Sequence, residues 1–268
     1  MKSIYSIFVA AALSSTLCAA AERYSLWPRR PAEIEQAQRL LQANKPVEAV
    51  QLLQPLISMD GIAGQEARQI VGAVNVGTYL SLRHPGAAVY TVKKGDNLAK
   101  IASAVHCPFE VMMLLNGLVD PASMHVGQKL VYVPMKQQLE IDLPRREVLV
   151  WDGTTLVASY KLLSVEGVSG SGQKVQTTVS ARDGYVAGGK IPAWSPMMGS
   201  SERSLVLGNG VVLSAGQGSG GKVLRMAQAD LNELALLVGV GNPVTLVYKA
   251  ADIPDAGQQI PAPAPVRK

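Results

Sequence analysis

The chain is poor in the residues that usually carry nucleophilic, redox or metal chemistry. It contains two cysteines and three histidines in 268 residues, and all of them lie in its first half. His84, His106 and His125 show no metal-ligand spacing, so we predict no metal site and no cofactor. Loss of an N-terminal leader that contains Cys18 would leave Cys107 alone, and an intramolecular disulfide would then be impossible.

The chain also lacks a large excess of charge of either sign. The 25 Lys and Arg residues and 20 Asp and Glu residues give a formal net charge of +5 at pH 7. This balance predicts no nucleic-acid binding and favours weak attraction to an anionic wall or membrane. The basic residues gather in scattered pairs rather than in a stripe: Arg29-Arg30, Lys93-Lys94, Arg145-Arg146 and Arg267-Lys268.

Long apolar runs are absent after the N-terminus. There, Lys2 precedes an apolar run over residues 7–13, and small residues follow up to Ala21. This pattern predicts a secretory signal peptide over residues 1–21 and an exported protein of the periplasm or cell envelope. A membrane anchor is the alternative, but a spanning helix needs about 20 apolar residues.

Cys18 raises a third alternative, a lipoprotein anchored at this residue. Leu17 stands where the lipid-attachment motif needs Gly, Ala or Ser. The sequence therefore favours cleavage near Ala21 over lipidation.

Residues 31–82 have the apolar spacing of a helical segment. Within it, residues 37–57 resemble one unit of a tetratricopeptide-like repeat. One unit cannot bury its own face as an array does, so we predict a small helical domain packed on a neighbour rather than a peptide-binding solenoid. The residues at helical spacing are Ile34, Ala37, Leu41, Val47, Val50, Leu53, Ala67, Ile70, Val71 and Val74.

Residues 90–134 combine strand and helix signals in a short space. The pattern of residues 90–92 predicts a strand, and Gly95 permits a tight turn after it. Asn97 is a good N-cap, which predicts a helix that runs to Val105.

A second helix is expected to begin at Pro108, a favoured first helical position, with Cys107 in the N-cap slot before it. This helix ends at Asn116, where Gly117 can supply the left-handed cap. Residues 130–133 then predict the last strand. The order strand, helix, helix, strand indicates one closed unit.

This unit resembles a lysin motif (LysM), a small module that binds N-acetylglucosamine-containing glycans such as peptidoglycan and chitin. The resemblance implies two antiparallel strands backed by two helices, with the glycan in a shallow groove between the first turn and the loop before the last strand. Alternatively, the glycines and asparagines of these loops are only turn and cap residues. The implied glycan-binding residues are Gly95, Asp96, Asn97, Leu98, Asn116, Gly117, Leu118 and Val119.

The pattern changes to strands over residues 137–249, and a Pro/Ala-rich tail follows over residues 250–268. One helix, over residues 229–237, precedes the last strand. The whole chain is therefore predicted to be α+β: a helical segment, a βααβ LysM module and a mostly-β domain with one late helix. The predicted strands cover residues 139–143, 147–151, 156–163, 175–181, 204–207, 211–214 and 243–248, with Asp152-Gly153 in a hairpin turn.

Residues 137–249 also resemble the catalytic domain of L,D-transpeptidases. The resemblance rests on Ile141-Asp142-Leu143, Val148-Leu149-Val150, Leu224-Arg225-Met226 and Gly241-Asn242-Pro243-Val244. That family uses a cysteine thiolate and a histidine in the pattern Ser-His-Gly-Cys, one residue, then Arg. The resemblance implies a remnant site at the corresponding positions, together with an aspartate of the family's closing signature. Its residues are Gly220, Gly221, Lys222, Val223, Arg225 and Asp230.

Residues 137–268 contain neither cysteine nor histidine. We therefore expect no catalytic residue of the family type, and interpret the protein as a peptidoglycan binder with an inactive transpeptidase-like domain that holds stem peptides or a wall-protein partner. The alternative is an active cell-wall transpeptidase or hydrolase that uses Ser214, Ser219 or Lys222. A phosphate-binding loop over residues 216–222 is disfavoured, because Val223 replaces the Ser or Thr that holds magnesium. The sequence does not indicate whether the protein is a monomer or an oligomer.

Overall fold

The computed structural model describes residues 31–170, 174–186, 189–191, 202–216 and 221–248. The predicted signal peptide over residues 1–21, the tail over 250–268, and Ser219 and Gly220 lie outside the described residues. The chain divides into two compact units, residues 1–54 and 55–268.

The first unit contains the helices α2 (Ala32–Gln42) and α3 (Pro46–Leu53), which pack against each other. Pro46 is the first residue of α3, where its missing amide hydrogen costs no helical hydrogen bond. The turn before it passes through Asn44 at φ 58°, a conformation that asparagine tolerates better than most residues. The first two predicted helices are thus formed.

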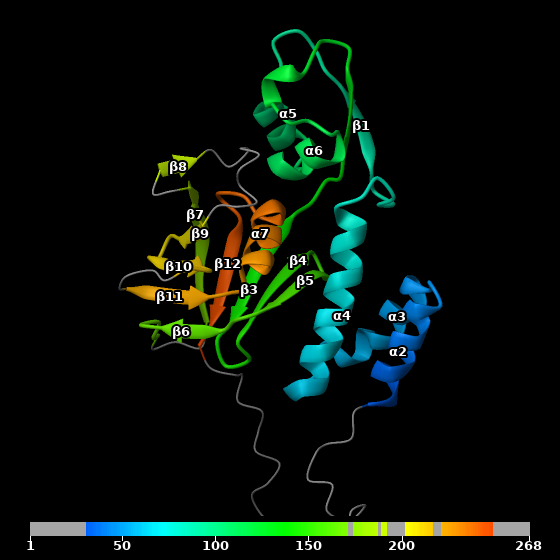
Figure 1. The fold of residues 1–268 in the computed structure, drawn as a ribbon, viewed down its shortest axis with the longest axis vertical. Helices are drawn as coiled ribbons and strands as arrows, with labels where there is room; N and C mark the ends of the chain where they lie inside the picture. Colours follow the sequence, from blue (N-terminus) through cyan, green and yellow to red (C-terminus); the bar gives the residue numbers. More distant parts are fainter. Residues whose placement is uncertain (1–30, 171–173, 187–188, 192–201, 217–220, 249–268) are drawn as a thin grey trace, which may run out of the picture. The chain divides into compact units, whose positions relative to one another are not determined.

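A short helix η1 (Gln54–Leu56) begins at the last residue of the first unit, and the long helix α4 (Gly61–Tyr79) follows in the second unit. Helix α4 packs along strand β5 (Thr155–Lys161) (Figure 1). The two backbones approach closely at Gly72, where an added Cβ would lie 2.6 Å from the backbone nitrogen of Ser159. The third predicted helix therefore packs on the C-terminal sheet.

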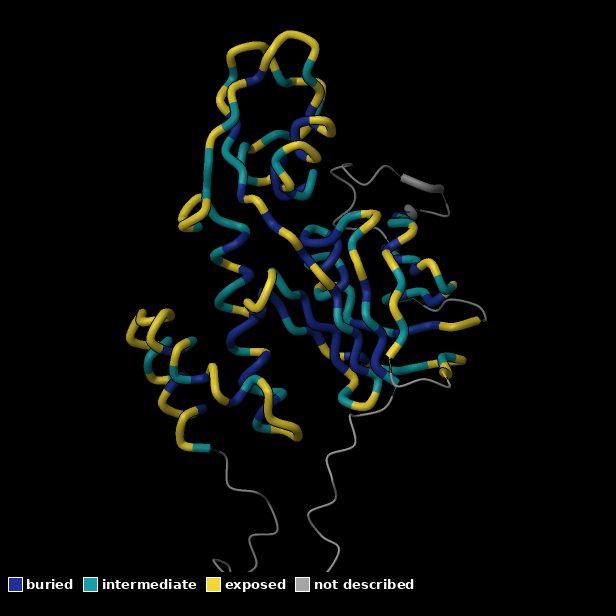
Figure 2. The backbone as a smooth tube through the Cα atoms, turned by 180° about the vertical axis from the view of Figure 1, so that it is seen from behind, coloured by how far each residue is buried: buried dark blue, intermediate teal, exposed yellow. Residues whose placement is uncertain are grey.

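The βααβ module consists of β1 (Ala88–Thr91), α5 (Leu98–Ala104), α6 (Phe109–Leu115), the 3-10 turn η2 (Pro121–Ser123) and β2 (Lys129–Tyr132). Strands β1 and β2 are antiparallel, with Ala88 opposite Tyr132. Its outer loops are exposed, whereas buried backbone is concentrated in the C-terminal sheet (Figure 2). The order strand, helix, helix, strand is the one that the sequence predicts.

The start of α6 differs by one residue from the prediction. The helix begins at Phe109, and Pro108 takes the N-cap with a φ of −55°, typical of proline, but an extended ψ of 136°. Cys107 is therefore a buried packing residue before the cap, not the cap itself. Proline fixes φ but leaves ψ free, so the sequence alone does not decide between the two positions.

The remaining strands form one mixed sheet in the order β5-β4-β3-β12-β7-β9-β10-β11-β6, with β8 paired to β7. Pairing is parallel between β3 and β12 and between β10 and β11. The other strands are β3 (Gln137–Asp142), β4 (Glu147–Asp152), β6 (Ser164–Glu166), β7 (Lys174–Val186), β8 (Gly189–Ile191), β9 (Glu202–Leu207), β10 (Val211–Ser214), β11 (Lys222–Arg225) and β12 (Pro243–Val247).

Strand β7 belongs to both halves of this sheet. Its first part pairs with β12 and its second part with β9, and the register shifts between Val179 and Ala181. The predicted strands all occur, and Gly153 turns the β4–β5 hairpin at φ 59°. Strands β6, β8 and β11 were not predicted. We call strands β3–β12 together with helix α7 (Gln228–Leu237) the sheet domain.

The strand β4 is covered on both faces. Val148 and Val150 belong to the main core, which includes Leu231 and Leu234 of α7. Leu149 is also buried but points to the opposite face, the one that α4 covers. Such two-sided burial explains the continuous apolar sequence of this strand.

Asp152 connects the two ends of the βααβ module to the sheet domain. Its Oδ2 accepts a hydrogen bond from Tyr79 Oη at 3.0 Å, just before the module, and its Oδ1 accepts one from the backbone nitrogen of Lys136 at 3.0 Å, just after it. Burial, and then the bond to Asp152, raises the pKa of Tyr79, which stays a neutral donor at physiological pH.

None of the helices within the described ranges is long and apolar enough to cross a membrane by itself. Helices α5 and α6 taken together have the length and apolar composition of a membrane-spanning segment, but the chain bends by 106° between them.

Candidate functional site

The first side of the predicted glycan groove is a turn held by its own polar side chains. Asp96 Oδ2 accepts hydrogen bonds from the Lys93 backbone nitrogen at 2.7 Å and from Tyr90 Oη at 2.9 Å. The bond from the Lys93 amide holds the pKa of Asp96 below its usual value, so the carboxylate stays charged. Asn97 Oδ1 caps α5 by accepting from the Lys100 nitrogen at 2.9 Å, which confirms the predicted cap.

The opposite side is organised by Asn116. Its amide nitrogen donates to the carbonyls of Met112 and Val131, both at 2.7 Å, and its Oδ1 accepts from the Val131 nitrogen at 2.7 Å. Gly117 follows at φ 61°, the predicted left-handed cap. Asn116 is thus fully used in joining α6 to β2, and its amide is not available to a ligand.

The two loops therefore offer backbone groups and apolar surface rather than free polar side chains. Leu98 is 2% exposed and belongs to the core, whereas Gly95 and Gly117 are exposed and Leu118 is half-buried. Val119 is 68% exposed. Exposed backbone amides can bond acetamido groups, and an apolar rim can cover a sugar face.

The predicted remnant site lies on and beside β11. Lys222 is exposed at the start of the strand, whereas Val223, the position that corresponds to the family nucleophile, is only 5% exposed. Arg225 forms an ion pair with Glu166 of β6, with Nε and Oε1 3.2 Å apart. Gly221 precedes the strand at φ 101°, and Gly220 lies outside the described residues.

The pairing of β10 with β11 shows that two of the alternative nucleophiles, Ser214 and Lys222, lie apart. Lys222 pairs with Val211 and Ser214 pairs with Arg225 along β10 and β11. Side chains alternate between faces along a strand, so Lys222 and Ser214 project from opposite faces of the sheet. The residues between 217 and 220, including Ser219, lie outside the described ranges.

Asp230 lies in the first turn of α7, where a negative charge suits the helix dipole, as the sequence predicts. Burial raises its pKa above the ordinary aspartate value. The neighbouring Glu233 accepts a hydrogen bond from Tyr160 of β5 at 3.0 Å, and burial raises the pKa of that tyrosine. These contacts link α7 to β5.

A pocket of about 420 Å³ lies between the βααβ module and the sheet domain, both within the second unit. Glu110 of α6 and Arg182 of β7 line it and form an ion pair, with Oε1 and Nη2 2.6 Å apart. Arg182 also donates through Nη1 to the carbonyls of Ala235 at 2.8 Å and Val238 at 3.0 Å. The two residues are 72 positions apart in the chain, and sequence reasoning missed the pair.

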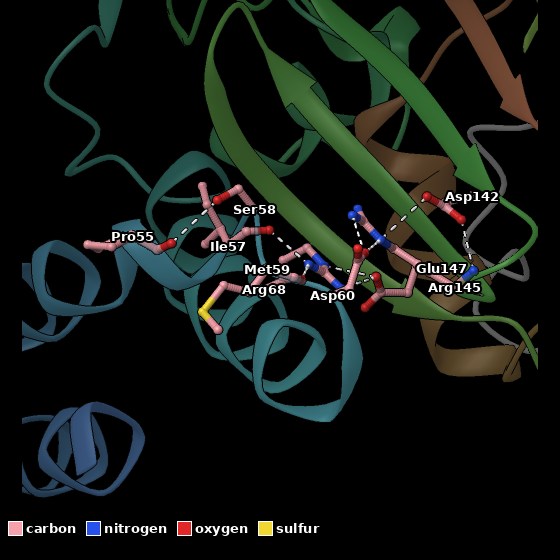
Figure 3. A network of polar contacts seen from close by, with 9 residues as sticks. All are labelled: Pro55, Ile57, Ser58, Met59, Asp60, Arg68, Asp142, Arg145 and Glu147. Atoms are coloured by element: carbon pink, nitrogen blue, oxygen red, sulfur yellow. Dashed lines mark hydrogen bonds and ion pairs between the residues drawn. The ribbon is translucent and has the colours of Figure 1, made fainter. Parts of the chain in front are cut away.

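A second polar network attaches α4 to the sheet (Figure 3). Arg68 of α4 and Glu147 of β4 are 1% and 0% exposed, and Arg68 Nε donates to Glu147 Oε2 at 2.8 Å. Arg68 Nη1 also donates to the carbonyls of Ile57 at 2.8 Å and Met59 at 2.9 Å. Arg145 joins Asp60 to Asp142 beside this pair. The network is structural, since its polar atoms are directed at one another.

Among the described residues, no group of histidine, cysteine, aspartate and glutamate side chains could hold a metal ion. The structure therefore offers no metal centre in these ranges to which the site residues could contribute.

The LysM domain family model matches residues 90–132. These residues form a LysM module. The match confirms the predicted lysin motif, and the LysM module has the βααβ order described above. No curated protein matches the chain.

Solved structures of L,D-transpeptidases, the family named from the sequence of residues 137–249, resemble the chain. L,D-transpeptidase 1 of Mycobacterium tuberculosis has 11% sequence identity to this chain and a TM-score of 0.30. The match covers 45% of this chain and 66%, just under two thirds, of the length of the transpeptidase. An L,D-transpeptidase of Xylanimonas cellulosilytica is 13% identical over 74% and 92%, with a TM-score of 0.29. A mutant L,D-transpeptidase of Enterococcus faecium is 12% identical over 70% and 86%, with a TM-score of 0.29.

Proposed function

We propose that this protein is an exported peptidoglycan-binding protein of the periplasm or cell envelope, anchored to glycan by its LysM module and carrying a catalytically inactive L,D-transpeptidase-like domain. The observation that carries the proposal is the LysM match over a completely formed βααβ unit. The apolar run and small residues before Ala21 support export.

The LysM loops suit a neutral sugar polymer. The side chains of Asp96, Asn97 and Asn116 are used in the fold, so recognition falls to exposed backbone amides and carbonyls and to apolar contacts such as Val119. A preformed backbone surface of this kind needs no charged partner. Peptidoglycan, which presents acetamido groups at regular intervals, fits these requirements.

The absence of catalysis is supported by the sequence of the sheet domain. Residues 137–268 contain no cysteine and no histidine, so the thiolate and the proton carrier of the transpeptidase mechanism have no counterpart. Ser214 and Lys222 project from opposite faces of the sheet, which disfavours a serine–lysine pair. A wall enzyme with another nucleophile is the second candidate.

The test incubates the full chain with purified sacculi and measures both sedimentation and the muropeptide profile. We expect the protein to sediment with sacculi and to leave the profile unchanged, with no difference for Lys222→Ala. Products that are released or cross-linked by the wild type and lost in Lys222→Ala would instead identify the protein as an enzyme.

The groove is tested by two matched variants. Val119 and Val126 are 68% and 64% exposed in the LysM module, but only Val119 belongs to the predicted groove. A charge that loses water on contact with sugar weakens binding, so Val119→Asp should reduce sacculus affinity by about tenfold. Val126→Asp should bind like the wild type. Equal binding by both variants would place the glycan elsewhere, and no sedimentation of the wild type would refute the proposal.

A further inference from the structure

The turn that leads from helix α4 into the LysM module is built around the side chain of His84. The backbone nitrogen of Ala87 donates to the His84 carbonyl at 2.9 Å and closes the turn directly before β1. The backbone nitrogen of Gly86 donates to His84 Nδ1 at 3.0 Å. One of the two hydrogen bonds of this turn therefore depends on an unprotonated imidazole nitrogen.

The imidazole ring of His84 is closely packed. It contacts the ring of Tyr79, the last residue of α4, with the ring centroids 4.4 Å apart and an interplanar angle of 54°. A Cβ added to Gly86 would lie 3.2 Å from both Nδ1 and Cε1 of His84, so the backbone passes close to the ring. The half-buried side chain is therefore part of the packing of this connection, not a freely rotating surface group.

Protonation of the ring changes which hydrogen bonds it can form. A neutral imidazole has one donor and one acceptor nitrogen, whereas both nitrogens of an imidazolium are donors. The Nδ1–H of a charged His84 would face the N–H of Gly86, and two donors at 3.0 Å cannot form a hydrogen bond. The charged ring and the closed turn are therefore incompatible in this geometry.

Two titratable groups lie near the ring on other elements, Tyr79 of α4 and Asp152 of β4. Burial lowers the pKa of His84, and the negative charge of Asp152 opposes this effect. Asp152 already accepts hydrogen bonds from Tyr79 Oη and from the Lys136 nitrogen. The charged side chains of Arg83 and Lys136 are exposed. Because burial is the larger effect, the closed turn favours the neutral ring.

We propose that His84 is a pH-sensitive switch in the first connection, residues 80–87, through which the chain enters the LysM module. Protonation of the ring opens the turn and loosens the chain before β1. The second connection, residues 133–136, contains no part of this switch and stays closed through the bond from the Met135 nitrogen to the His106 carbonyl at 2.7 Å. Acidification thus gives the LysM module more freedom at one of its two connections. This regulation goes beyond glycan binding by the module and does not depend on it.

The direction of the pH dependence follows from proton linkage. The pKa of His84 is lower in the closed turn than in an open one, so the open form binds the proton more tightly. The closed turn is therefore stable above 6.5, the ordinary pKa of histidine, and loses stability as the pH falls below that value.

The test follows the full chain by NMR between pH 7.5 and pH 5. Imidazole ¹⁵N shifts report whether His84 Nδ1 carries a proton, and amide hydrogen exchange, divided by the intrinsic rate at each pH, reports the protection of Gly86. We expect an unprotonated Nδ1 at pH 7.5. At pH 5, loss of the hydrogen bond should reduce the protection of Gly86 at least about threefold.

Two histidine variants separate the switch from general effects of acid. His84→Asn supplies an oxygen that can accept from the amide two residues further on and that does not titrate, so the protection of Gly86 should be equal at both pH values. His125→Asn is its control, because His125 is exposed in a different loop of the LysM module, and it should keep the wild-type pH response.

Three results would overturn the proposal. A proton on Nδ1 at pH 7.5, or unchanged protection of Gly86 in the wild type at pH 5, would do so whether or not the variants fold. An equal loss of protection in His84→Asn and the wild type would assign the response to another group. These measurements use no sacculi, so failure of the switch is distinguishable from failure of glycan binding.

Discussion

The ion pair between Arg68 and Glu147 makes helix α4 part of the sheet domain's stability, and Arg68→Met tests this directly. The change keeps a side chain of similar length but leaves the Glu147 carboxylate, which is fully buried, without its partner. It also removes the donor that the carbonyls of Ile57 and Met59 share. Within the described part of the chain, Glu147 Oε1 accepts no hydrogen bond that could compensate.

The magnitude follows from the cost of breaking a buried pair from one side. Such changes reduce the free energy of unfolding by about 3–5 kcal/mol. For a domain of this size, each kcal/mol corresponds to roughly 2–4 °C, so the Tm should fall by roughly 6–20 °C. Removing both charges in Arg68→Met/Glu147→Leu should restore much of the loss, because no buried charge is then left unpaired.

The pH dependence gives an independent check. Burial raises the pKa of Glu147 and Arg68 lowers it, so the folded-state pKa rises further when Arg68 is replaced. A carboxyl whose pKa is higher in the folded than in the unfolded state binds protons more tightly when folded, and it stabilises the fold as pH decreases. The loss of stability in Arg68→Met should therefore be large at pH 7.5 and smaller as the pH approaches 4.5, the ordinary pKa of glutamate.

Urea unfolding followed by tryptophan fluorescence and circular dichroism, at pH 7.5 and pH 5, measures both effects. A loss below about 1 kcal/mol at pH 7.5, typical of an exposed pair, would refute the buried geometry. An equal loss at the two pH values would show that Glu147 is not the group left uncompensated.

Three further predictions concern single positions. Asn97→Ala removes the cap of α5 and should destabilise the LysM module by about 1 kcal/mol, measured by thermal unfolding, with no loss expected for Asn97→Ser. Gly72→Ala should destabilise the protein by roughly 1–3 kcal/mol because the new Cβ would lie 2.6 Å from a β5 backbone nitrogen, whereas Gly77→Ala on the same helix has open space and should stabilise by about 0.5–1 kcal/mol; equal urea midpoints would contradict the close packing of α4. Burial raises the pKa of Cys107 to about 11, so iodoacetamide should label it slowly at pH 8 in the folded protein and rapidly in urea; fast labelling of the folded protein would show that the thiol is accessible.

Local signals were sufficient to predict much of this fold. Asn97 caps α5, Gly117 ends α6 in the left-handed region, and Gly153 turns the β4–β5 hairpin, each as its residue type suggests. These features depend on a few neighbouring residues, so the sequence displays them directly. The late helix α7 follows from apolar spacing in the same way.

Features that depend on distant residues were not predictable. Strands β6 and β8 have three residues each, too few for a pattern, and β11 is parallel to β10 across residues that include a glycine-rich stretch. Arg68 and Glu147 are 79 residues apart, and Glu110 and Arg182 are 72 apart. Charged residues at such separations look like ordinary surface positions in the sequence, and only the fold brings them into buried pairs.

Asp152 gives the LysM module a particular mechanical relation to the sheet domain. The chain rises into the module after Tyr79 and returns at Lys136, and one carboxylate binds both segments, each at 3.0 Å. Tension on the module is therefore divided between two parallel legs that are clamped at a common point, instead of passing through a single flexible linker. With glycan bound to the LysM module as proposed, we expect the sheet domain to be held close to the polymer, because both connections to the module meet at Asp152.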